Sequence, residues 1–206
     1  MAIKIKYPIN LHKGLTPLIV SGMMIFYNNF TLGPWVYLAL HGGYGVLWLL
    51  KDRVYPDKRW EEEVSVGLAL TTFLFLGLYW VAPFLLISQG TVPPLPLVAG
   101  AIACNSFGLV LHYAGDAQKH FVLQARSGLI DDGFFERCRN TNYLGEFLIY
   151  LSFAMLSQHW LAFVILIVFT VLVFVPGMKQ KDESLSRYPE FEDYQKRSGL
   201  FFPKLF

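Results

Sequence analysis

The chain has 206 residues, of which 54% are hydrophobic and 16% are charged, and its formal net charge is +2. This composition excludes an ordinary soluble globular domain, in which about 25% of the residues are charged. The basic residues form no patch apart from the loops that flank apolar segments, which argues against a nucleic-acid partner.

Long apolar blocks follow one another along the chain. Windows of about 18 residues predict about six transmembrane helices, because a helix needs roughly that length to cross the hydrocarbon core of a bilayer. The predicted spans cover 14–32, 35–50, 64–88, 95–113, 143–158 and 160–177. We therefore predict an all-α polytopic membrane protein, with 1–206 forming a single membrane domain.

The basic residues support this division. All 17 Lys and Arg residues fall on one side of the membrane if the six helices alternate in direction. The opposite connections, 33–34, 89–94 and 157–159, carry none. The positive-inside rule therefore predicts an integral membrane protein with both termini in the cytoplasm.

The segments after residue 113 contain the largest parts predicted to lie outside the membrane. We expect the fourth helix to continue to about Gln124 and the chain to turn at Ser127-Gly128. From Lys179 onward the pattern predicts a cytoplasmic C-terminal helix with a break at Pro189. Its apolar residues are expected to pack on one side, and they are Leu185, Tyr188, Phe191 and Tyr194.

The most polar sequence lies at the start of the fifth predicted span, where 139–146 are Arg-Asn-Thr-Asn-Tyr-Leu-Gly-Glu. Polar groups are costly beside hydrocarbon, so this concentration indicates a bound polar ligand. Asn142 and Glu146 share one helix face and can hydrogen-bond a ribose or an amide, while Gly145 would let the ligand approach the backbone. The alternative is a helix N-cap, in which Asn142 satisfies backbone amides and Glu146 opposes the helix dipole.

A second group of polar residues lies on the fourth predicted helix. His112, Asp116 and His120 are spaced by four residues and would share one helix face, a pattern compatible with a metal site. On a straight helix they would spread over ~12 Å, which is too far for one ion without ligands from elsewhere. We therefore predict no metal site. Asp116 and Lys119 are instead candidate cofactor contacts, and the alternative is a solvated extension of the helix.

A third group follows the sixth predicted span. Lys181 and Asp182 are candidate cofactor contacts because they follow a helix that pairs with the one carrying Asn142. Glu183 and Arg187 nearby have the spacing of ordinary surface pairs on a helix, which is the alternative interpretation.

The second predicted span contains His41 and Tyr44 among glycines at 42, 43 and 45. Glycines favour close packing of membrane helices, which is one interpretation. The other is that His41 or Tyr44 points into a cavity and handles a proton, because ionisable groups inside a membrane are functional candidates.

These residues together resemble the steroid 5α-reductase and sterol reductase superfamily, whose C-terminal halves carry an Asn-Tyr/Phe-x-Gly-Glu/Asp motif, a hydrophobic hairpin and a basic-acidic pair. The resemblance covers roughly residues 110–206. Its ordered matches are Asp116, Gln118-Lys119, Gly128-Leu129, Arg139, Asn142-Tyr143-x-Gly145-Glu146, Lys181-Asp182-Glu183, Tyr188-Pro189, Tyr194 and Pro203. The resemblance implies NADPH bound on the cytoplasmic side and a lipid-like enone or olefin that enters from the bilayer.

On this basis the N-terminal helices, 1–113, form the substrate side, and 114–206 form the cofactor-binding half. The implied cofactor contacts are Asp116, Lys119, Arg126, Arg139, Asn142, Tyr143, Glu146, Lys181, Asp182 and Tyr194. Of these, the four basic residues are expected near the phosphates. Tyr44 or His41 is the expected catalytic group, which polarises a carbonyl or delivers a proton.

The same fold houses isoprenylcysteine carboxyl methyltransferases and phospholipid N-methyltransferases, which use S-adenosylmethionine. Those enzymes carry Arg-His-Pro-x-Tyr where this chain has Arg-Asn-Thr-Asn-Tyr at 139–143. The frame is shared, but the His and Pro are missing and the Asn-Tyr-x-Gly-Glu motif is present. We therefore expect an NADPH-dependent membrane reductase of a lipid-like double bond, and the alternative is a membrane methyltransferase that uses S-adenosylmethionine.

Overall fold

The computed structural model describes residues 2–204, and 76% of it is helical, which confirms the predicted all-α class. The chain divides into two compact units. Unit 1 contains the chain up to Ala103 together with Ser152–Ile165. Unit 2 contains Cys104–Leu151 and the chain from Leu166 onward.

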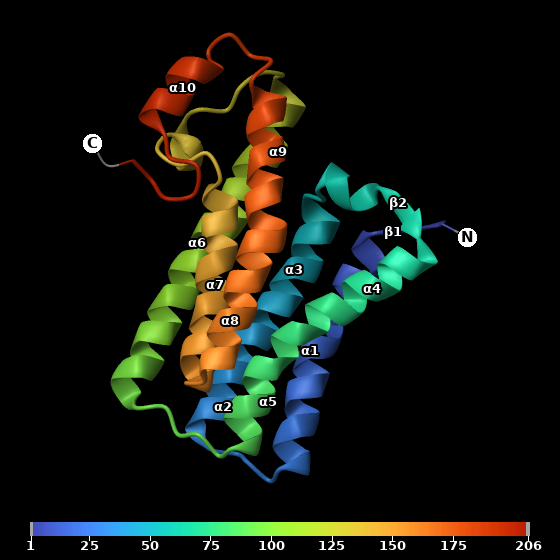
Figure 1. Cartoon of the computed structure of the whole chain (residues 1–206), viewed down its shortest axis with the longest axis vertical. Coiled ribbons are helices and arrows are strands. Elements are labelled where there is room, and N and C mark those ends of the chain that lie inside the picture. Colours follow the sequence, from blue (N-terminus) through green and yellow to red (C-terminus); the bar gives the residue numbers. More distant parts are fainter. Residues whose placement is uncertain (1, 205–206) are drawn as a thin grey trace. The chain divides into compact units, whose positions relative to one another are not determined.

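Unit 1 is built mainly from the helices of the first half of the chain (Figure 1). They are α1 (Lys6–Phe26), α2 (Leu32–Tyr37), α3 (Gly43–Val54), α4 (Val66–Leu76) and α5 (Val81–Ser88). A π-helical segment, Leu38–Gly42, joins α2 to α3, and a 3-10 segment, Gly77–Trp80, joins α4 to α5. Each pair is therefore one continuous helix. α1 packs against α3 and α4.

A small antiparallel sheet joins the start of the chain to the segment before α4 in unit 1. It was not predicted from the sequence. Strand β1 (Ala2–Lys4) pairs with β2 (Glu63–Ser65), so that Ile3 lies opposite Val64. A 3-10 helix, Lys58–Glu61, precedes β2. The Glu61 carboxylate accepts hydrogen bonds from Lys4 and Lys6, at 2.8 Å for Lys4. Residues far apart in the sequence thereby hold the start of α1 to the start of α4.

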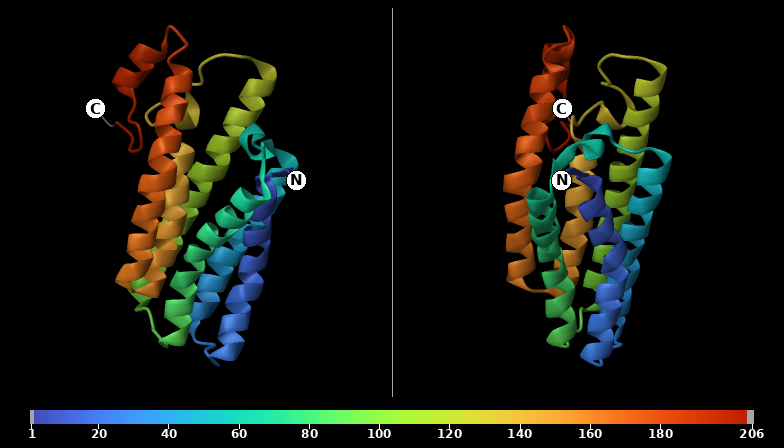
Figure 2. Two further views of the ribbon diagram at one scale, coloured as in Figure 1. Left: turned by 45° about the vertical axis from the view of Figure 1, so that its right-hand side comes forward. Right: turned by 90° about the vertical axis from the view of Figure 1, so that its right-hand side faces the viewer.

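Unit 2 contains most of two long helices and the C-terminal part of the chain. α6 (Leu95–Ala125) and α7 (Thr141–Ser157) are joined by a segment with a 3-10 turn at Gly133–Phe135. α8 (Trp160–Phe169), a π-helical segment (Thr170–Phe174) and α9 (Val175–Leu185) form one continuous helix, which α10 (Phe191–Arg197) follows. α10 lies beside the segment that joins α6 to α7 (Figure 2).

Two glycines bring α6 and α7 into close contact within unit 2. A Cβ atom on Gly145 would lie 2.6 Å from the carbonyl oxygen of Gly108 and would clash with the backbone of His112. Small residues at such contacts let membrane helices approach closely. The space beside Gly145 is thus filled by α6, whereas the sequence suggested a ligand there.

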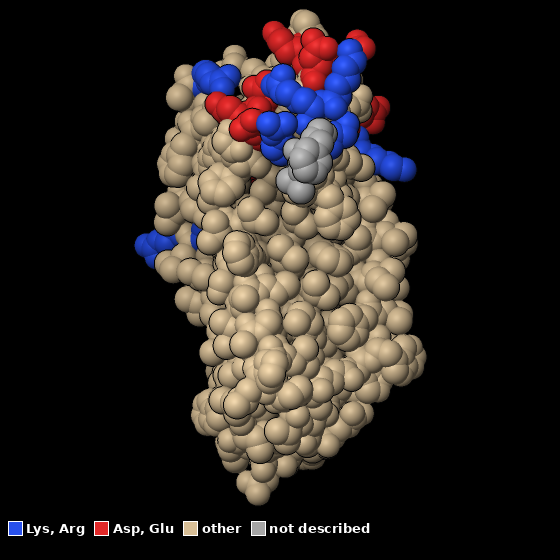
Figure 3. Space-filling view, turned by 90° about the vertical axis from the view of Figure 1, so that its left-hand side faces the viewer, with Lys and Arg blue, Asp and Glu red and all other residues tan. Residues whose placement is uncertain are grey.

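Within residues 2–204, three continuous helices are long and apolar enough to cross a membrane, namely Val66–Ser88, Leu95–Ala125 and Trp160–Leu185. Six spans remain a prediction. The boundaries also differ, because α1 begins at Lys6 rather than at 14, and the last long helix continues to Leu185 rather than ending at 177. Figure 3 shows charged side chains gathered at one end of the face that it draws, with very few along the rest of that face.

Candidate functional site

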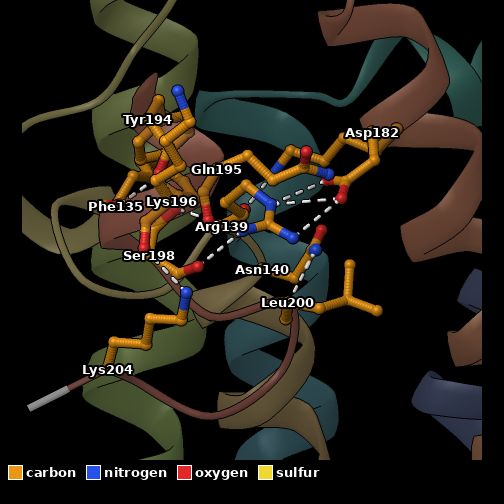
Figure 4. A network of polar contacts seen from close by, with 11 residues as sticks. Phe135, Arg139, Asn140, Asp182, Tyr194, Gln195, Lys196, Ser198, Leu200 and Lys204 are labelled. Carbon is orange, nitrogen blue, oxygen red and sulfur yellow. Dashed lines mark hydrogen bonds and ion pairs between the residues drawn. The ribbon is translucent and has the colours of Figure 1, made fainter. Parts of the chain in front are cut away.

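The polar sequence at the start of α7 is built around Arg139, whose side chain is buried (Figure 4). Its Nε donates to both carboxylate oxygens of Asp182 on α9, each at 3.1 Å, and its Nη2 donates to one of them at 2.9 Å. Its Nη1 donates to the carbonyl and hydroxyl oxygens of Ser198, at 2.6 Å and 3.2 Å. A fork of this kind fits a carboxylate closely, so Arg139 clamps α9 and the end of α10 to the start of α7.

The segment that follows α10 runs parallel to the residues before α7. The Arg139 amide donates to the Gly199 carbonyl and the Gly199 amide donates to the Arg137 carbonyl, both at 2.9 Å. The Asn140 side-chain amide donates to the Leu200 carbonyl at 2.9 Å. These backbone contacts fix the position of Asn140, whose side chain is fully buried.

Tyr194 of α10 holds the loop before α7 from the other side. Its hydroxyl donates to the Phe135 carbonyl at 2.6 Å. Its ring packs with Leu129 and Phe191, and partly buried residues complete this cluster, namely Leu185 and Tyr188. The four apolar residues predicted to pack together do so, although they come from the end of α9, the following turn and α10 rather than from one helix. Burial raises the pKa of the Tyr194 phenol, so the hydroxyl stays a hydrogen-bond donor well above neutral pH.

Asn142 connects α7 to the polar face of α6. Its side-chain nitrogen donates to the buried Asp116 carboxylate at 3.0 Å, and its backbone carbonyl lies 3.1 Å from Nδ1 of His112. Its side-chain oxygen is buried and has no hydrogen-bond partner among residues 2–204. A helix cap would need this oxygen to accept from a backbone amide. The capping interpretation of Asn142 is therefore wrong.

A second acceptor of the same kind lies two residues earlier. The side-chain oxygen of Asn140 is also buried and also lacks a partner within the described part of the chain. An unsatisfied buried acceptor costs about 1–3 kcal/mol. Two of them at the start of one helix can accept hydrogen bonds from a ligand that carries hydroxyl or amide donors.

The remaining predicted cofactor contacts of unit 2 lie in different surroundings. Lys181 donates to the Arg139 carbonyl at 2.5 Å, and its ammonium lies 4.7 Å from the centre of the Phe135 ring. The Arg126 side chain is exposed and lies 3.9 Å from the Asp132 carboxylate. The Tyr143 ring meets the Phe174 ring edge-on, with 5.4 Å between centroids. The last two, Lys119 and Glu146, are partly buried.

The predicted catalytic pair belongs to unit 1. His41 and Tyr44 are fully buried. The Tyr37 hydroxyl lies 3.0 Å from Nδ1 of His41, and the His41 ring stacks on Phe153 at 4.2 Å. The Lys13 ammonium lies 4.1 Å from the centre of the Tyr44 ring. Both candidates therefore have fixed orientations.

Within the described part of the chain, no group of three or more His, Cys, Asp and Glu residues is arranged to hold a metal ion. His112 and Asp116 instead lie close to Asn142 through the contacts above.

A family model described as "Protein of unknown function (DUF1295)" matches residues 52–198, well over half of the chain. The chain belongs to the DUF1295 family. DUF1295 is a domain of the steroid 5-alpha-reductase-like superfamily, so the resemblance is confirmed at the level of the superfamily. No curated protein matches the chain significantly. The DUF1295 match contains Arg139, Asp182 and Ser198 but not His41 and Tyr44.

Two residues that contact Arg139 were not predicted from the sequence. Ser198 contributes mainly its carbonyl oxygen, and Gln195 contributes its carbonyl alone, 3.4 Å from Nη1 of Arg139. A backbone acceptor leaves no signal in residue type. The glycine at position 199 could have indicated a close backbone contact, because a side chain there would clash with the Phe202 carbonyl.

Proposed function

We propose that this DUF1295 protein is a membrane reductase that uses NADPH to reduce a double bond of a lipid-like molecule, such as a steroid, a sterol or another enone. Three features support the proposal: membership of the superfamily, helices apolar enough for a bilayer, and the two unsatisfied amide oxygens at the start of α7. The amide oxygens support it most directly, because they call for a ligand with hydrogen-bond donors.

The residues of unit 2 fit a nicotinamide nucleotide. The oxygens of Asn140 and Asn142 can accept from ribose hydroxyls or from a carboxamide, and the Asp116 carboxylate lies beside Asn142. Tyr143 and Glu146 follow on the same helix. When bound, NADPH would supply the hydride, and these residues would hold and orient it.

The role that we propose for Arg139 is to position the site. Its donors go to Asp182, Ser198 and Gln195, and Lys181 donates to the Arg139 carbonyl. In this arrangement both side chains fix the start of α7, so we assign phosphate contacts to the other two predicted cations, Lys119 and Arg126. Tyr194 fixes the adjoining loop through Phe135.

In unit 1, His41 and Tyr44 remain the proposed groups that polarise a substrate carbonyl or deliver a proton. Tyr37 holds the His41 ring in place, and a donor with a fixed position lowers the barrier to proton transfer. We expect Tyr44→Phe or His41→Ala to lower turnover of a reducible lipid by ~10²–10⁴. If both variants turn over at the normal rate, this assignment is wrong.

A methyltransferase that uses S-adenosylmethionine is the second candidate, on a specific observation. A surface cavity of about 510 Å³ beside α9 and α10 is lined by carboxylates and aromatic rings, including Glu183, Glu192 and Tyr188. Such a lining suits a cationic sulfonium. The substrate would then be a phospholipid amine or a prenylated carboxylate, as implied for the related methyltransferases.

Isothermal titration of the detergent-purified protein with NADPH and, separately, with S-adenosylmethionine tests the proposal. We expect micromolar NADPH binding that Asn142→Ala and Asn140→Ala abolish. The control variant is Gln124→Ala, which removes an exposed amide at the end of α6 and should bind normally. Binding of S-adenosylmethionine alone would establish the second candidate, and binding of neither would reject both.

A further inference from the structure

The segment that follows α10, residues 198–204, is held at both ends within unit 2, and we call it the C-terminal strap. The amides of Gly199 and Lys204 both donate to the Arg137 carbonyl, at 2.9 Å and 3.0 Å. The Lys204 side chain also donates to the Lys196 carbonyl at 2.7 Å (Figure 4). The residues between these contacts therefore follow a fixed course.

The middle of the strap presents an apolar patch, which Leu200, Phe201 and Phe202 form. Phe202 is 64% exposed, and the other two residues are partly exposed. The rings of Phe201 and Phe202 meet each other, with 4.8 Å between centroids. Because these apolar side chains are contiguous, an apolar environment can cover them together, and their burial from water is favourable.

The apolar patch reaches the level of the apolar turns of α6. The Phe201 ring meets the Phe147 ring of α7, with 5.5 Å between centroids. Phe147 lies two residues beyond Gly145, where α7 touches Gly108 of α6. α6 is long and apolar enough to cross a membrane, and its Phe107, next to Gly108, is 69% exposed. The depth of the strap therefore corresponds to the part of unit 2 where apolar side chains are available to lipid.

Basic side chains flank the apolar patch. Arg137, whose carbonyl holds both ends of the strap, and Lys204 are exposed. Glu136 lies 3.5 Å from the Arg137 side chain, but both side chains are more than half exposed, so solvent screens their attraction. The strap itself contains no Asp or Glu. An apolar patch flanked by exposed cations matches the boundary between the acyl chains and the phosphates of an anionic membrane.

We propose that the C-terminal strap is a docking surface for anionic phospholipids. Leu200 and Phe202 enter the boundary between head groups and acyl chains, while Arg137 and Lys204 bind the lipid phosphates. Apolar contact and charge add in interfacial binding, and each basic residue beside an anionic surface strengthens it about fivefold. The Asn140 side-chain amide donates to the Leu200 carbonyl, so the docked strap also stays against the start of α7.

Hydrogen exchange of the full-length protein in nanodiscs, without any nucleotide, tests this surface. The discs contain either phosphatidylcholine alone or an equal mixture of phosphatidylcholine and phosphatidylglycerol. We expect the backbone amides of 200–202 to exchange at least about fivefold more slowly in the anionic discs. Arg137→Gln and Lys204→Gln should each reduce this ratio of exchange rates, and the double variant should abolish it. Phe202→Ala should reduce it as well, because the apolar contact is lost.

Two variants serve as matched controls. Lys58→Gln removes an exposed lysine between α3 and α4, far from the strap in sequence. Phe107→Ala removes a ring on α6 that is as exposed as that of Phe202. Both variants should leave the ratio of exchange rates unchanged. In about 0.5 M salt the wild-type ratio should fall toward one, because salt screens the attraction between the cations and the lipid phosphates.

Several outcomes would overturn the proposal. Equal exchange in the two kinds of disc would mean that the strap does not recognise anionic lipid. A ratio that persists in the double variant or at high salt would mean that the two cations do not bind the phosphates, and an unchanged ratio in Phe202→Ala would exclude the apolar contact. If a variant does not fold, the two lipids and the salt dependence of the wild type still decide. Since no nucleotide is present, failure of the proposed reductase function would not affect these results.

Discussion

The two units bury their cations in different ways. In unit 2 the guanidinium of Arg139 meets a carboxylate and two backbone carbonyls, so its direction is fixed by hydrogen bonds. In unit 1 the ammonium groups of Lys13 and Lys51 lie over aromatic rings. Arginine has a rigid planar fork, whereas lysine is a flexible point charge. The first arrangement fixes the cation by directional hydrogen bonds, and the second places it against the faces of aromatic rings.

The largest effect is expected when the carboxylate that Arg139 binds is removed. Asp182→Ala would leave the Arg139 guanidinium buried without its counter-charge, since the two side chains are 6% and 15% exposed. We expect a loss of about 3–5 kcal/mol in the free energy of unfolding. SDS-induced unfolding in mixed micelles, followed by circular dichroism, measures it.

An exposed ion pair provides the matched control. Lys196 on α10 pairs with Glu192 and Asp193, and these side chains are 65%, 80% and 80% exposed. Lys196→Met should leave the unfolding curve unchanged, because solvent screens such pairs. If Asp182→Ala were equally harmless, Arg139 would not depend on the carboxylate and the clamp would be misassigned.

The closest helix contacts come next in expected effect, and here the two units are alike. Gly45 meets the Lys13 carbonyl in unit 1, and Gly145 meets the Gly108 carbonyl in unit 2. An added methyl group must push the helices apart, so Gly45→Ala and Gly145→Ala should each cost about 1–3 kcal/mol in the free energy of unfolding.

Gly43 is the control for both glycine variants. A Cβ atom there would meet nothing within 4 Å, although Gly43 lies only two residues from Gly45 on the same helix. Gly43→Ala should be neutral or stabilising, because alanine favours helix. A loss as large as that of Gly45→Ala would contradict the close contact as the reason for the cost at Gly45, since Gly43 has no such contact.

Much of the fold was predictable, because the lengths of the apolar segments determine the long helices and the turn residues mark where helices end. The helix predicted at 64–88 is present as Val66–Ser88, and the turn at Ser127-Gly128 follows the end of α6 at Ala125. The sheet of β1 and β2 was missed because it pairs two strands of three residues each, far apart in sequence. Short strands of this kind lack the alternation that identifies a strand.

The candidate site was predictable in its residue types but not in its pairings. The sequence singled out Arg139, Asn142, Asp116 and Asp182, and the structure joins them as two pairs, Arg139 with Asp182 and Asn142 with Asp116. Sequence alone suggested that Arg139 faces a phosphate, because spacing along the chain does not show which carboxylate lies opposite. The burial of Lys13 and Lys51 in unit 1 was not predicted, because each resembles an ordinary basic residue near a helix end.

Tyr194 tests the clamp region with a smaller effect. Tyr194→Phe removes the hydrogen bond to the buried Phe135 carbonyl and should cost ~1–2 kcal/mol in the free energy of unfolding. Since burial raises the pKa of the folded phenol, its contribution is complete below the ordinary pKa of about 10 and is lost as pH rises above it. From pH 8 upward, the free energy of unfolding should therefore fall more steeply in the wild type than in Tyr194→Phe. Parallel curves of free energy against pH would contradict this role.

The smallest effect is expected at the junction of β1 and β2 in unit 1, where charges pair at the surface instead of in the interior. Hydrogen bonds from Lys4 and Lys6 hold the pKa of Glu61 below its usual value, so the stability that this carboxylate adds is present above that value and is lost as pH falls through the lowered pKa. Glu61→Gln should remove this acid dependence and lower the melting temperature slightly at low salt. At 0.5 M salt the two proteins should have the same melting temperature, because salt then limits the attraction between exposed charges to a few ångströms. A difference in melting temperature that persists at high salt would mean that Glu61 is bound as firmly as Asp182. The surface pairing in unit 1 and the buried pairing in unit 2 would then be equivalent.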